Sequence, residues 1–226
     1  MSTFVDIIRE SADGSLNGVS DAIVFAMGII IIALVIVSIF AFVVSAVLAI
    51  SYIKYNRRQN SCKKTGEQVA RKILDDNGLN NIKVSKTGSI MFGNSYSHYF
   101  KKVRLRRLTW KKDSVTSLSM AAQKSALAIL DKEGDPDMKS RVKMTPVIYF
   151  GPLAFIPLII IGAILDIFVF NNPNGTCMIV CSILGLLIYI ASFIMSILVL
   201  KTEKKAQTRA LEIMENEGLA TPEELA

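Results

Sequence analysis

The feature that most constrains this sequence is an uncharged run of 32 residues, Ala22 to Ile53. A helix of about 20 apolar residues is long enough to cross the hydrocarbon core of a bilayer, which is roughly 30 Å thick. A cleaved signal peptide has instead a basic start and an apolar stretch of only about 7 to 15 residues. Residues 1–21 carry four acidic side chains and one arginine. The run therefore predicts a transmembrane helix over residues 22–53.

Two further apolar runs lie in the second half of the chain. Residues 147–170 are interrupted only by Asp166, and residues 177–200 have no charged side chain. Residues 171–176, with the sequence NNPNGT, have the composition of a turn. A carboxylate inside a bilayer is costly and faces a partner or a cavity, so Asp166 either has such a role or lies at the outer interface. We therefore predict three membrane spans, over 22–53, 147–170 and 177–200.

The distribution of charge predicts the orientation of these spans, because lysine and arginine concentrate on the cytoplasmic side. Residues 54–145 contain 21 Lys and Arg against 8 Asp and Glu, a net charge of +13, whereas residues 1–21 have a net charge of −3. The N-terminal segment 1–21 and the turn 171–176 are then outside. Residues 54–145 are then cytoplasmic, and so is a C-terminal helix predicted over residues 201–226.

The basic segment 54–145 begins with a predicted helix. Thr65 and Gln68 form a capping-box pair, which predicts the start of this helix, and Asn77-Gly78 predicts its end. After this helix, residues 81–84 predict a short strand. The segment therefore starts as a helix followed by a strand.

The rest of this segment completes an α+β pattern. Residues 88–97 predict a loop, because they are rich in glycine, serine and asparagine. Residues 102–108 predict a half-buried strand, because Val103 and Leu105 alternate with basic side chains. Residues 114–133 predict a second helix with one apolar face.

Four segments, in this order and spacing, carry a resemblance to a known family. They are KTGEQVARKILDDNGLNNIKV (64–84), SHYFKKVRL (97–105), AAQKSALAILDKEGD (from Ala121) and LKTEKKAQTRALEIMENEGLATPEEL (200–225). Together they resemble the bacterial neutral zinc metallopeptidases, which are integral membrane peptidases. The resemblance extends over about residues 40–226, and it implies that the helix 114–133 corresponds to the zinc-binding HExxH helix of that family.

The resemblance also shows what this sequence lacks. It places the family's first zinc histidine, general-base glutamate and second zinc histidine at Gln123, Lys124 and Leu127, and its third ligand at Glu203. A catalytic zinc needs three protein ligands and an open position for water. His98 is the only histidine in the chain, so no other imidazole can replace the missing ones. We therefore predict no metal, no cofactor and no catalytic residue, and we expect Lys124 to pair with Glu203.

Basic residues cluster around the single tryptophan. They form the set Arg104, Arg106, Arg107, Trp110, Lys111 and Lys112. Such a set can contact phosphates and stack a base. A segment beside a bilayer is basic for topological reasons, however, and anionic lipid offers about 1 kcal/mol per basic residue. We therefore predict lipid or partner binding rather than nucleic-acid binding, and we interpret His98 as a packing or surface group.

The whole sequence predicts an α-helical integral membrane protein with three transmembrane helices and a cytoplasmic α+β zincin-like domain, which is a degenerate metallopeptidase domain. The predicted function is that of a pseudopeptidase of the bacterial cytoplasmic (inner) membrane, acting as a binding, scaffold or regulatory protein. The predicted partners are the lipid bilayer and an active membrane protease or another membrane protein. One alternative is a membrane zinc metallopeptidase, as the resemblance alone implies. Another is a membrane-surface protein that binds anionic lipid through its basic domain.

Overall fold

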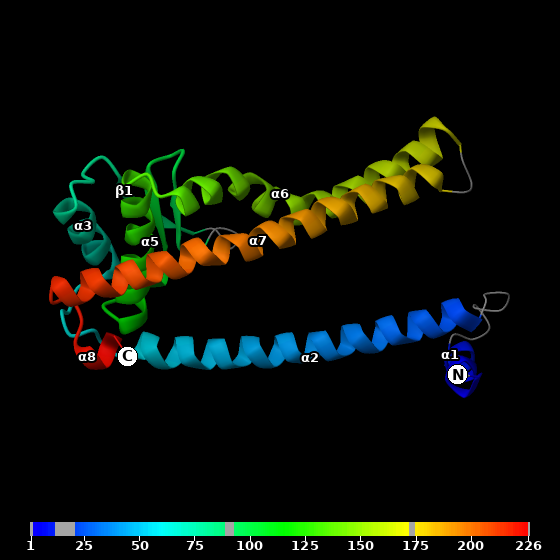
Figure 1. Ribbon diagram of the computed structural model, residues 1–226, viewed down its shortest axis with the longest axis horizontal. Helices are drawn as coiled ribbons and strands as arrows, with labels where there is room; N and C mark the ends of the chain where they lie inside the picture. Colours follow the sequence, from blue (N-terminus) through cyan, green and yellow to red (C-terminus); the bar gives the residue numbers. More distant parts are fainter. Residues whose placement is uncertain (1, 12–20, 89–92, 172–174, 226) are drawn as a thin grey trace. The chain divides into compact units, whose positions relative to one another are not determined.

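The computed structural model describes residues 2–11, 21–88, 93–171 and 175–225 (Figure 1). The chain forms two units, Met1–Tyr55 and Asn56–Ala226. Among the described residues, three helices are long and apolar enough to cross a membrane. The prediction of three apolar membrane helices is therefore confirmed.

The first unit consists of α1 (Ser2–Ser11) and most of α2 (Asp21–Arg57). α1 was not predicted from the sequence, and it packs on the beginning of α2. Val5 of α1 and Val24 of α2 are both buried. Gly28 allows the close approach, because a Cβ at this position would lie 2.2 Å from a side-chain carbon of α1.

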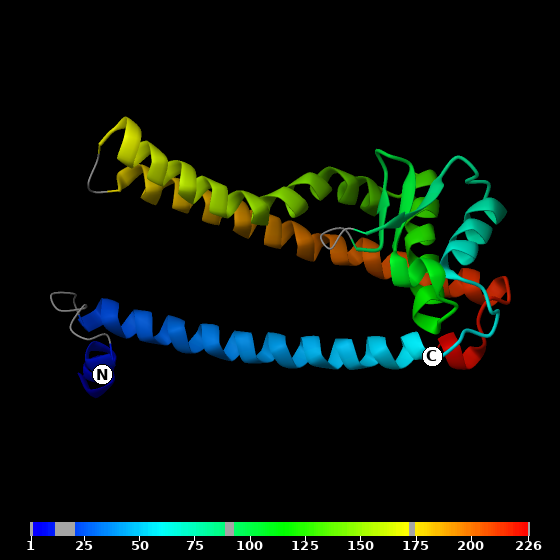
Figure 2. The same ribbon diagram turned by 180° about the vertical axis from the view of Figure 1, so that it is seen from behind.

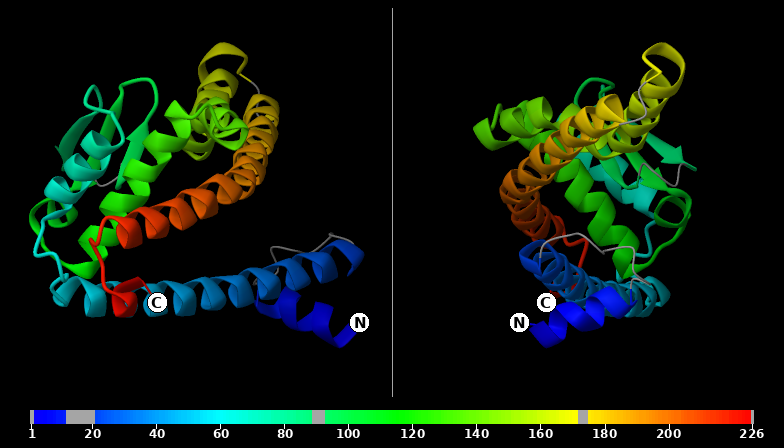
Figure 3. Two further views of the ribbon diagram at one scale, coloured as in Figure 1. Left: turned by 60° about the vertical axis from the view of Figure 1, so that its left-hand side comes forward. Right: turned by 90° about the vertical axis from the view of Figure 1, so that its right-hand side faces the viewer.

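The second unit contains a long helical hairpin. Its arms are α6 (Pro136–Ile164), which ends in a π-helical turn η1 (Leu165–Val169), and α7 (Thr176–Asn216). Figure 2 and Figure 3 show the two arms side by side. A Cβ added to Gly151 of α6 would lie 2.6 Å from Cβ of Ser192 on α7. Small residues therefore let the two backbones approach closely, as in other membrane helix pairs.

Both arms of the hairpin extend beyond the predicted spans. α6 begins at Pro136, inside the segment predicted to be cytoplasmic, and α7 continues past Leu200 to Asn216 without a break. The predicted boundary at residue 200 marks a change from apolar to charged side chains. It does not mark the end of a helix, because no glycine or proline follows until Gly218.

Three prolines lie inside α6, and the partner of one freed carbonyl is on α7. A proline lacks an N–H and leaves the carbonyl four residues earlier without its helical donor. For Pro152 this carbonyl belongs to Ile148, and Oγ of Ser192 donates a hydrogen bond to it at 3.2 Å. The proline thus creates a polar contact between the two arms.

Asp166 has a structural partner at the tip of the hairpin. Its Oδ1 accepts from the backbone N–H of Cys177 at 3.0 Å, and its Oδ2 accepts from that of Met178 at 2.7 Å. These N–H groups belong to the first turn of α7, where helical donors have no intrahelical acceptor. Asp166 is 4% exposed and therefore acts as a buried cap of the returning helix. The adjoining turn residues 172–174 lie outside the described residues.

The remainder of the second unit is an α+β arrangement. Its elements are α3 (Gly66–Asp76), β1 (Lys83–Thr87), β2 (Ser95–Ser97), β3 (Lys102–Arg106), α4 (Arg107–Lys111), α5 (Val115–Lys132) and α8 (Pro222–Leu225). The sheet has the order β1-β3-β2, with β1 parallel and β2 antiparallel to the central β3. The predicted α+β pattern is thus present as helices around a small mixed sheet.

Several boundaries of the strands differ from the predictions. The strand predicted at 81–84 lies at 83–87, and the predicted loop 88–97 contains β2 at its end. β2 is held by pairing with β3, which a three-residue Ser-Tyr-Ser pattern does not reveal. The strand predicted over 102–108 stops at Arg106, because Arg107 begins α4.

The two helices predicted for the basic segment 54–145 are present. Thr65 and Gln68 form both hydrogen bonds of the capping box at the start of α3. Ser114 caps α5 by accepting from the backbone N–H of Ser117. Val103 and Leu105 of β3 are fully buried, as their alternation indicated.

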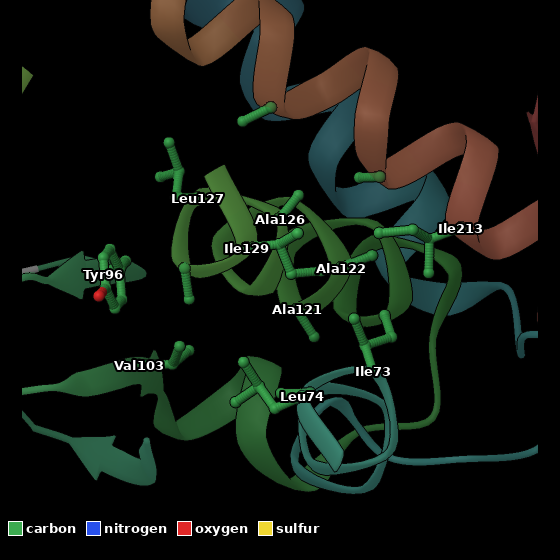
Figure 4. Packing of buried hydrophobic residues seen from close by; sticks show 14 of the residues in the cluster. Ile73, Leu74, Tyr96, Val103, Ala121, Ala122, Ala126, Leu127, Ile129 and Ile213 are labelled. Carbon is green, nitrogen blue, oxygen red and sulfur yellow. The ribbon is translucent and has the colours of Figure 1, made fainter. Parts of the chain in front are cut away.

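The core of this unit gathers around α5 (Figure 4). Ala122 and Ala126 of α5 are fully buried, as are Ile73 and Leu74 of α3. The C-terminal part of α7 covers the same helix through small and apolar residues such as Ala206. α5 is therefore surrounded by α3, the sheet and α7, and this packing fixes the side chains described next.

Candidate functional site

The most highly connected polar group that involves the predicted site residues is the carboxylate of Glu203 on α7. Nζ of Lys124 on α5 lies 2.9 Å from its Oε2, and Nε2 of Gln123 donates to the same oxygen at 3.3 Å. Arg141 on α6 donates to Oε1 from two nitrogens, at 2.8 and 3.2 Å. Three helices thus converge on one carboxylate, and the expected pair between Lys124 and Glu203 is present.

The residues of this Glu203 network are held in place by the local sequence. Gln123 and Lys124 are neighbours on α5, beside the alanines that let α7 approach. Glu203 follows Leu200, the last residue of the uncharged run 177–200, by about one helical turn. Arg141 lies in the charged first turns of α6. Arg141 and Glu203 therefore come from charged segments of α6 and α7. Gln123 and Lys124 come from α5, which packs beside α7.

The Glu203 network is shielded from solvent. The side chains of Lys124, Arg141 and Glu203 are 12%, 13% and 25% exposed. Charges this close together interact strongly when water is largely excluded. Two cations around one anion leave the site with a net positive charge, which opposes the entry of a metal ion.

Leu127 does not join this network. Its side chain is 0% exposed and belongs to the hydrophobic core, where Figure 4 shows it on α5. The four positions that the resemblance singled out therefore separate into two environments. Gln123, Lys124 and Glu203 meet in one polar site, and Leu127 packs with apolar neighbours.

The donor groups at these positions do not fit a catalytic zinc. Zinc requires several histidine, cysteine or carboxylate ligands within about 2.3 Å. Gln123 supplies an amide, Lys124 a cation and Leu127 a hydrocarbon, while both oxygens of Glu203 accept from cations. Over the described residues, moreover, no three His, Cys, Asp or Glu side chains are grouped so that they could hold a metal ion.

His98 lies in a second polar cluster, around Asp131 at the end of α5. Nδ1 of His98 lies 2.7 Å from Oδ2 of Asp131, and the hydroxyl of Tyr96 donates to that oxygen at 2.6 Å. Nζ of Lys101 lies 3.3 Å from the same oxygen of Asp131. The interpretation of His98 as a packing or surface group stays a prediction, and the structure adds that its ring is oriented by Asp131.

The protonation states in this Asp131 cluster follow from its contacts. Burial raises the pKa of Asp131, but hydrogen bonds from Tyr96 and His98 and the charge of Lys101 outweigh burial, so the pKa lies below its ordinary value. Burial, together with the adjacent carboxylate of Asp131, raises the pKa of Tyr96. Asp131 is therefore an anion at neutral pH, and Tyr96 is a neutral donor.

A cavity of about 560 Å³ opens beside both clusters. One wall is formed by β2 and the following residues, including His98, Tyr99 and Phe100, and the opposite wall is α6 from Arg141 to Leu153. Arg141 thus borders the cavity and also belongs to the Glu203 network. This cavity was not predicted from the sequence.

The basic set predicted to bind lipid or a partner is divided between two elements. Arg104 and Arg106 lie on β3, and Arg107 and Lys111 are exposed on α4. The remaining two members have partners inside the protein. Trp110 packs against the core, and Nζ of Lys112 donates to the carbonyl of Asn56 at 2.8 Å.

Two functional side chains were missed by reasoning from the sequence. Arg141 was interpreted only as one of the charges that set the orientation of the second span. Asp131 was interpreted as an ordinary residue of the helix 114–133. No local pattern distinguishes them, because each acquires its role from a residue at least 30 positions away.

Comparisons with known proteins complete the description of the site. The family model described as "Putative neutral zinc metallopeptidase" matches residues 29–226. The chain is also 27% identical over 169 residues to the "Putative membrane protease YugP" of Bacillus subtilis (strain 168), which covers 73% of this chain and 68% of that protein. No solved structure matches the chain significantly.

Proposed function

The chain belongs to the neutral zinc metallopeptidase family, as its sequence motifs indicated, and we propose that it is a pseudopeptidase, a member that binds or regulates but does not hydrolyse peptides. The observation that carries the proposal is the full engagement of Glu203. Both of its oxygens accept from cations, Lys124 and Arg141. A zinc ion would have to displace these cations and would gain one carboxylate ligand where three protein ligands are required.

The proposed domain is zincin-like, with α5 in the place of the zinc helix. Support comes from the family relationship and from the position of α5, which lies beside the mixed sheet and faces Glu203 on a following helix. In an active zincin, histidines would stand where Gln123 and Leu127 stand here, one turn apart. The scaffold is kept in this proposal, and the metal ligands are lost.

The proposed location is the bacterial cytoplasmic (inner) membrane, with the N-terminus outside and the α+β domain in the cytoplasm. The net charge of +13 over residues 54–145 supports this orientation. The B. subtilis relative is named "Putative membrane protease", which supports a membrane location. The proposed partner is an active membrane protease or another membrane protein, which would meet the domain beside the bilayer.

An active membrane zinc metallopeptidase is the alternative that the family relationship offers. A cleavage assay tests the proposal against it. Purified protein in detergent is incubated with fluorescein-labelled casein, with zinc added or with a chelator. The same assay on Glu203→Gln measures the contribution of the one remaining ligand.

We expect the parent protein and Glu203→Gln to show the same background rate, unchanged by zinc or by the chelator. The proposal fails if the parent cleaves casein in a chelator-sensitive manner and Glu203→Gln does not. The chelator comparison uses one protein in both arms, so an effect of the substitution on stability does not obscure the result.

A further inference from the structure

The 560 Å³ cavity beside α6 has two chemically distinct halves. Its polar half includes Arg104 on β3, Arg141 on α6 and His98. Its apolar half includes Phe150 and Leu153, also on α6. Such a division suits a ligand that has a polar end and an apolar body.

The charge of the lining residues indicates which charge the polar end of such a ligand carries. Among the described residues that line the cavity, two are arginines and none is acidic. Arg141 also donates to Glu203, which does not line the cavity. The guanidinium of Arg104 lies over the ring of Phe100, at 5.4 Å from its centroid. Nδ1 of His98 is oriented by Asp131, which leaves Nε2 as the second polar atom of the ring. Arginine is the preferred partner of carboxylates and phosphates, so the polar half is complementary to an anion.

The apolar half lies where α6 changes from charged to apolar residues. Arg141 and Lys143 precede this point, and the uncharged run begins at Val147. Tyr149 lies on α6 at this transition, lines the cavity and is 42% exposed. Exposed tyrosine side chains at such a transition are typical of the membrane interface, where headgroups and acyl chains meet.

We infer that this cavity binds one anionic phospholipid from the surrounding bilayer, with its headgroup toward Arg104 and Arg141 and an acyl chain along Phe150 and Leu153. The volume is within the range of about 300 to 1,000 Å³ found for small-molecule sites, which is enough for a headgroup and the beginning of the chains. The inference goes beyond the proposed function, and it does not depend on the loss of the zinc site.

A peptide with an apolar stretch and a terminal carboxylate is the competing occupant. The lipid is favoured because the apolar half belongs to a candidate membrane span, so acyl chains reach it without leaving the bilayer. A peptide would have to displace them. The experiment therefore includes both ligands.

Native mass spectrometry of the full chain in detergent tests the inference. Delipidated protein is titrated with dioleoyl-phosphatidylglycerol, dioleoyl-phosphatidylcholine or an apolar peptide that ends in a carboxylate. The variant Arg104→Gln removes a charge inside the cavity. The variant Arg57→Gln is the matched control, because it removes the same charge from an exposed position at the end of α2 that does not line the cavity and does not belong to the basic set.

We expect one phosphatidylglycerol to bind more tightly than phosphatidylcholine, and Arg104→Gln to weaken it about tenfold, the effect of one charge-assisted hydrogen bond. Arg57→Gln should leave the affinity unchanged, and Arg104→Lys should restore most of it. The inference is overturned if the two lipids bind equally, if both glutamine variants weaken binding equally, or if only the peptide binds. A thermal unfolding curve for each variant confirms that it is folded.

Discussion

A double-mutant cycle between Lys124 and Glu203 tests whether the polar site is held together as described. The cycle compares Lys124→Met, Glu203→Gln and the double variant with the parent protein. Glu203→Gln removes the anion that pairs with both Lys124 and Arg141, whose side chains are 12% and 13% exposed. Two shielded cations then remain without a counter-charge.

The magnitudes follow from this shielding. Removing one partner of a buried ion pair costs about 3–5 kcal/mol. Because the Glu203 side chain is 25% exposed, we take the lower end, about 3 kcal/mol, for Glu203→Gln. Lys124→Met leaves Glu203 paired with Arg141, so it should cost only about 1.5 kcal/mol, the loss of one charged hydrogen bond.

The double variant should be less destabilised than the sum of the single variants. Once Glu203 is neutral, removing Lys124 also removes an unpaired cation, which predicts a coupling energy of about 1–2 kcal/mol. For a chain of this size, each kcal/mol lowers the midpoint of thermal unfolding by about 2–4 °C. The midpoint can be followed by the fluorescence of Trp110, the only tryptophan, which packs against the core of this domain.

A matched control is the pair of Lys201 and Asp137, which also joins α7 to α6. The distance between their charged atoms is 3.1 Å, but the Lys201 side chain is 77% exposed. Lys201→Met should therefore cost about 0.5 kcal/mol or less. The reasoning is refuted if Glu203→Gln destabilises no more than this control, or if the effects of Lys124→Met and Glu203→Gln simply add.

Two further predictions concern the other buried carboxylates. The folded-state pKa of Asp131 is lowered, so its ionised form stabilises the fold at neutral pH, and this contribution is lost as the pH falls through that lowered value. Asp131→Asn should therefore lower the thermal midpoint at pH 7, and the difference from the parent should shrink as the pH falls below about 4, the ordinary pKa of an aspartate; a constant difference would contradict this. Asp166→Ala removes the cap at the start of α7 and should cost about 1–2 kcal/mol, measured as a lower midpoint in detergent, whereas an unchanged midpoint would show that the two contacts do not stabilise the hairpin.

Local sequence codes predicted the parts of the fold that depend on neighbouring residues. The capping box of Thr65 and Gln68 is one example, because both of its hydrogen bonds are completed within one helical turn. The alternation of Val103 and Leu105 with basic side chains correctly predicted that both are buried, because this pattern also depends only on neighbouring residues. Hydropathy gave the three apolar helices, because a bilayer requires a long uncharged stretch.

Features that depend on distant residues were not predicted correctly. β2 exists because it pairs with β3, and its short Ser-Tyr-Ser sequence has no strong preference of its own. A helix was predicted over residues 201–226, but its continuity with the third apolar helix was not, because a change from apolar to charged residues does not by itself end a helix.

The candidate site shows the same division. The resemblance to the family led to the expected pair of Lys124 and Glu203, which the structure contains. It succeeded because related proteins share the packing of the two helices that carry these residues. Arg141 was missed, because its role depends on how α6 packs beside α7. The role of Asp131 likewise depends on contacts with β2 and the turn that follows it.

The most direct test of the account is the zinc content of the purified full chain, measured by elemental mass spectrometry after dialysis against zinc-containing and then zinc-free buffer. A triple variant, Gln123→His, Lys124→Glu and Leu127→His, restores the ligands of the family and is measured in parallel. The account predicts substoichiometric zinc in the parent protein, because Glu203 is occupied by two cations. About one zinc ion per parent chain, as in a catalytic site, would contradict it.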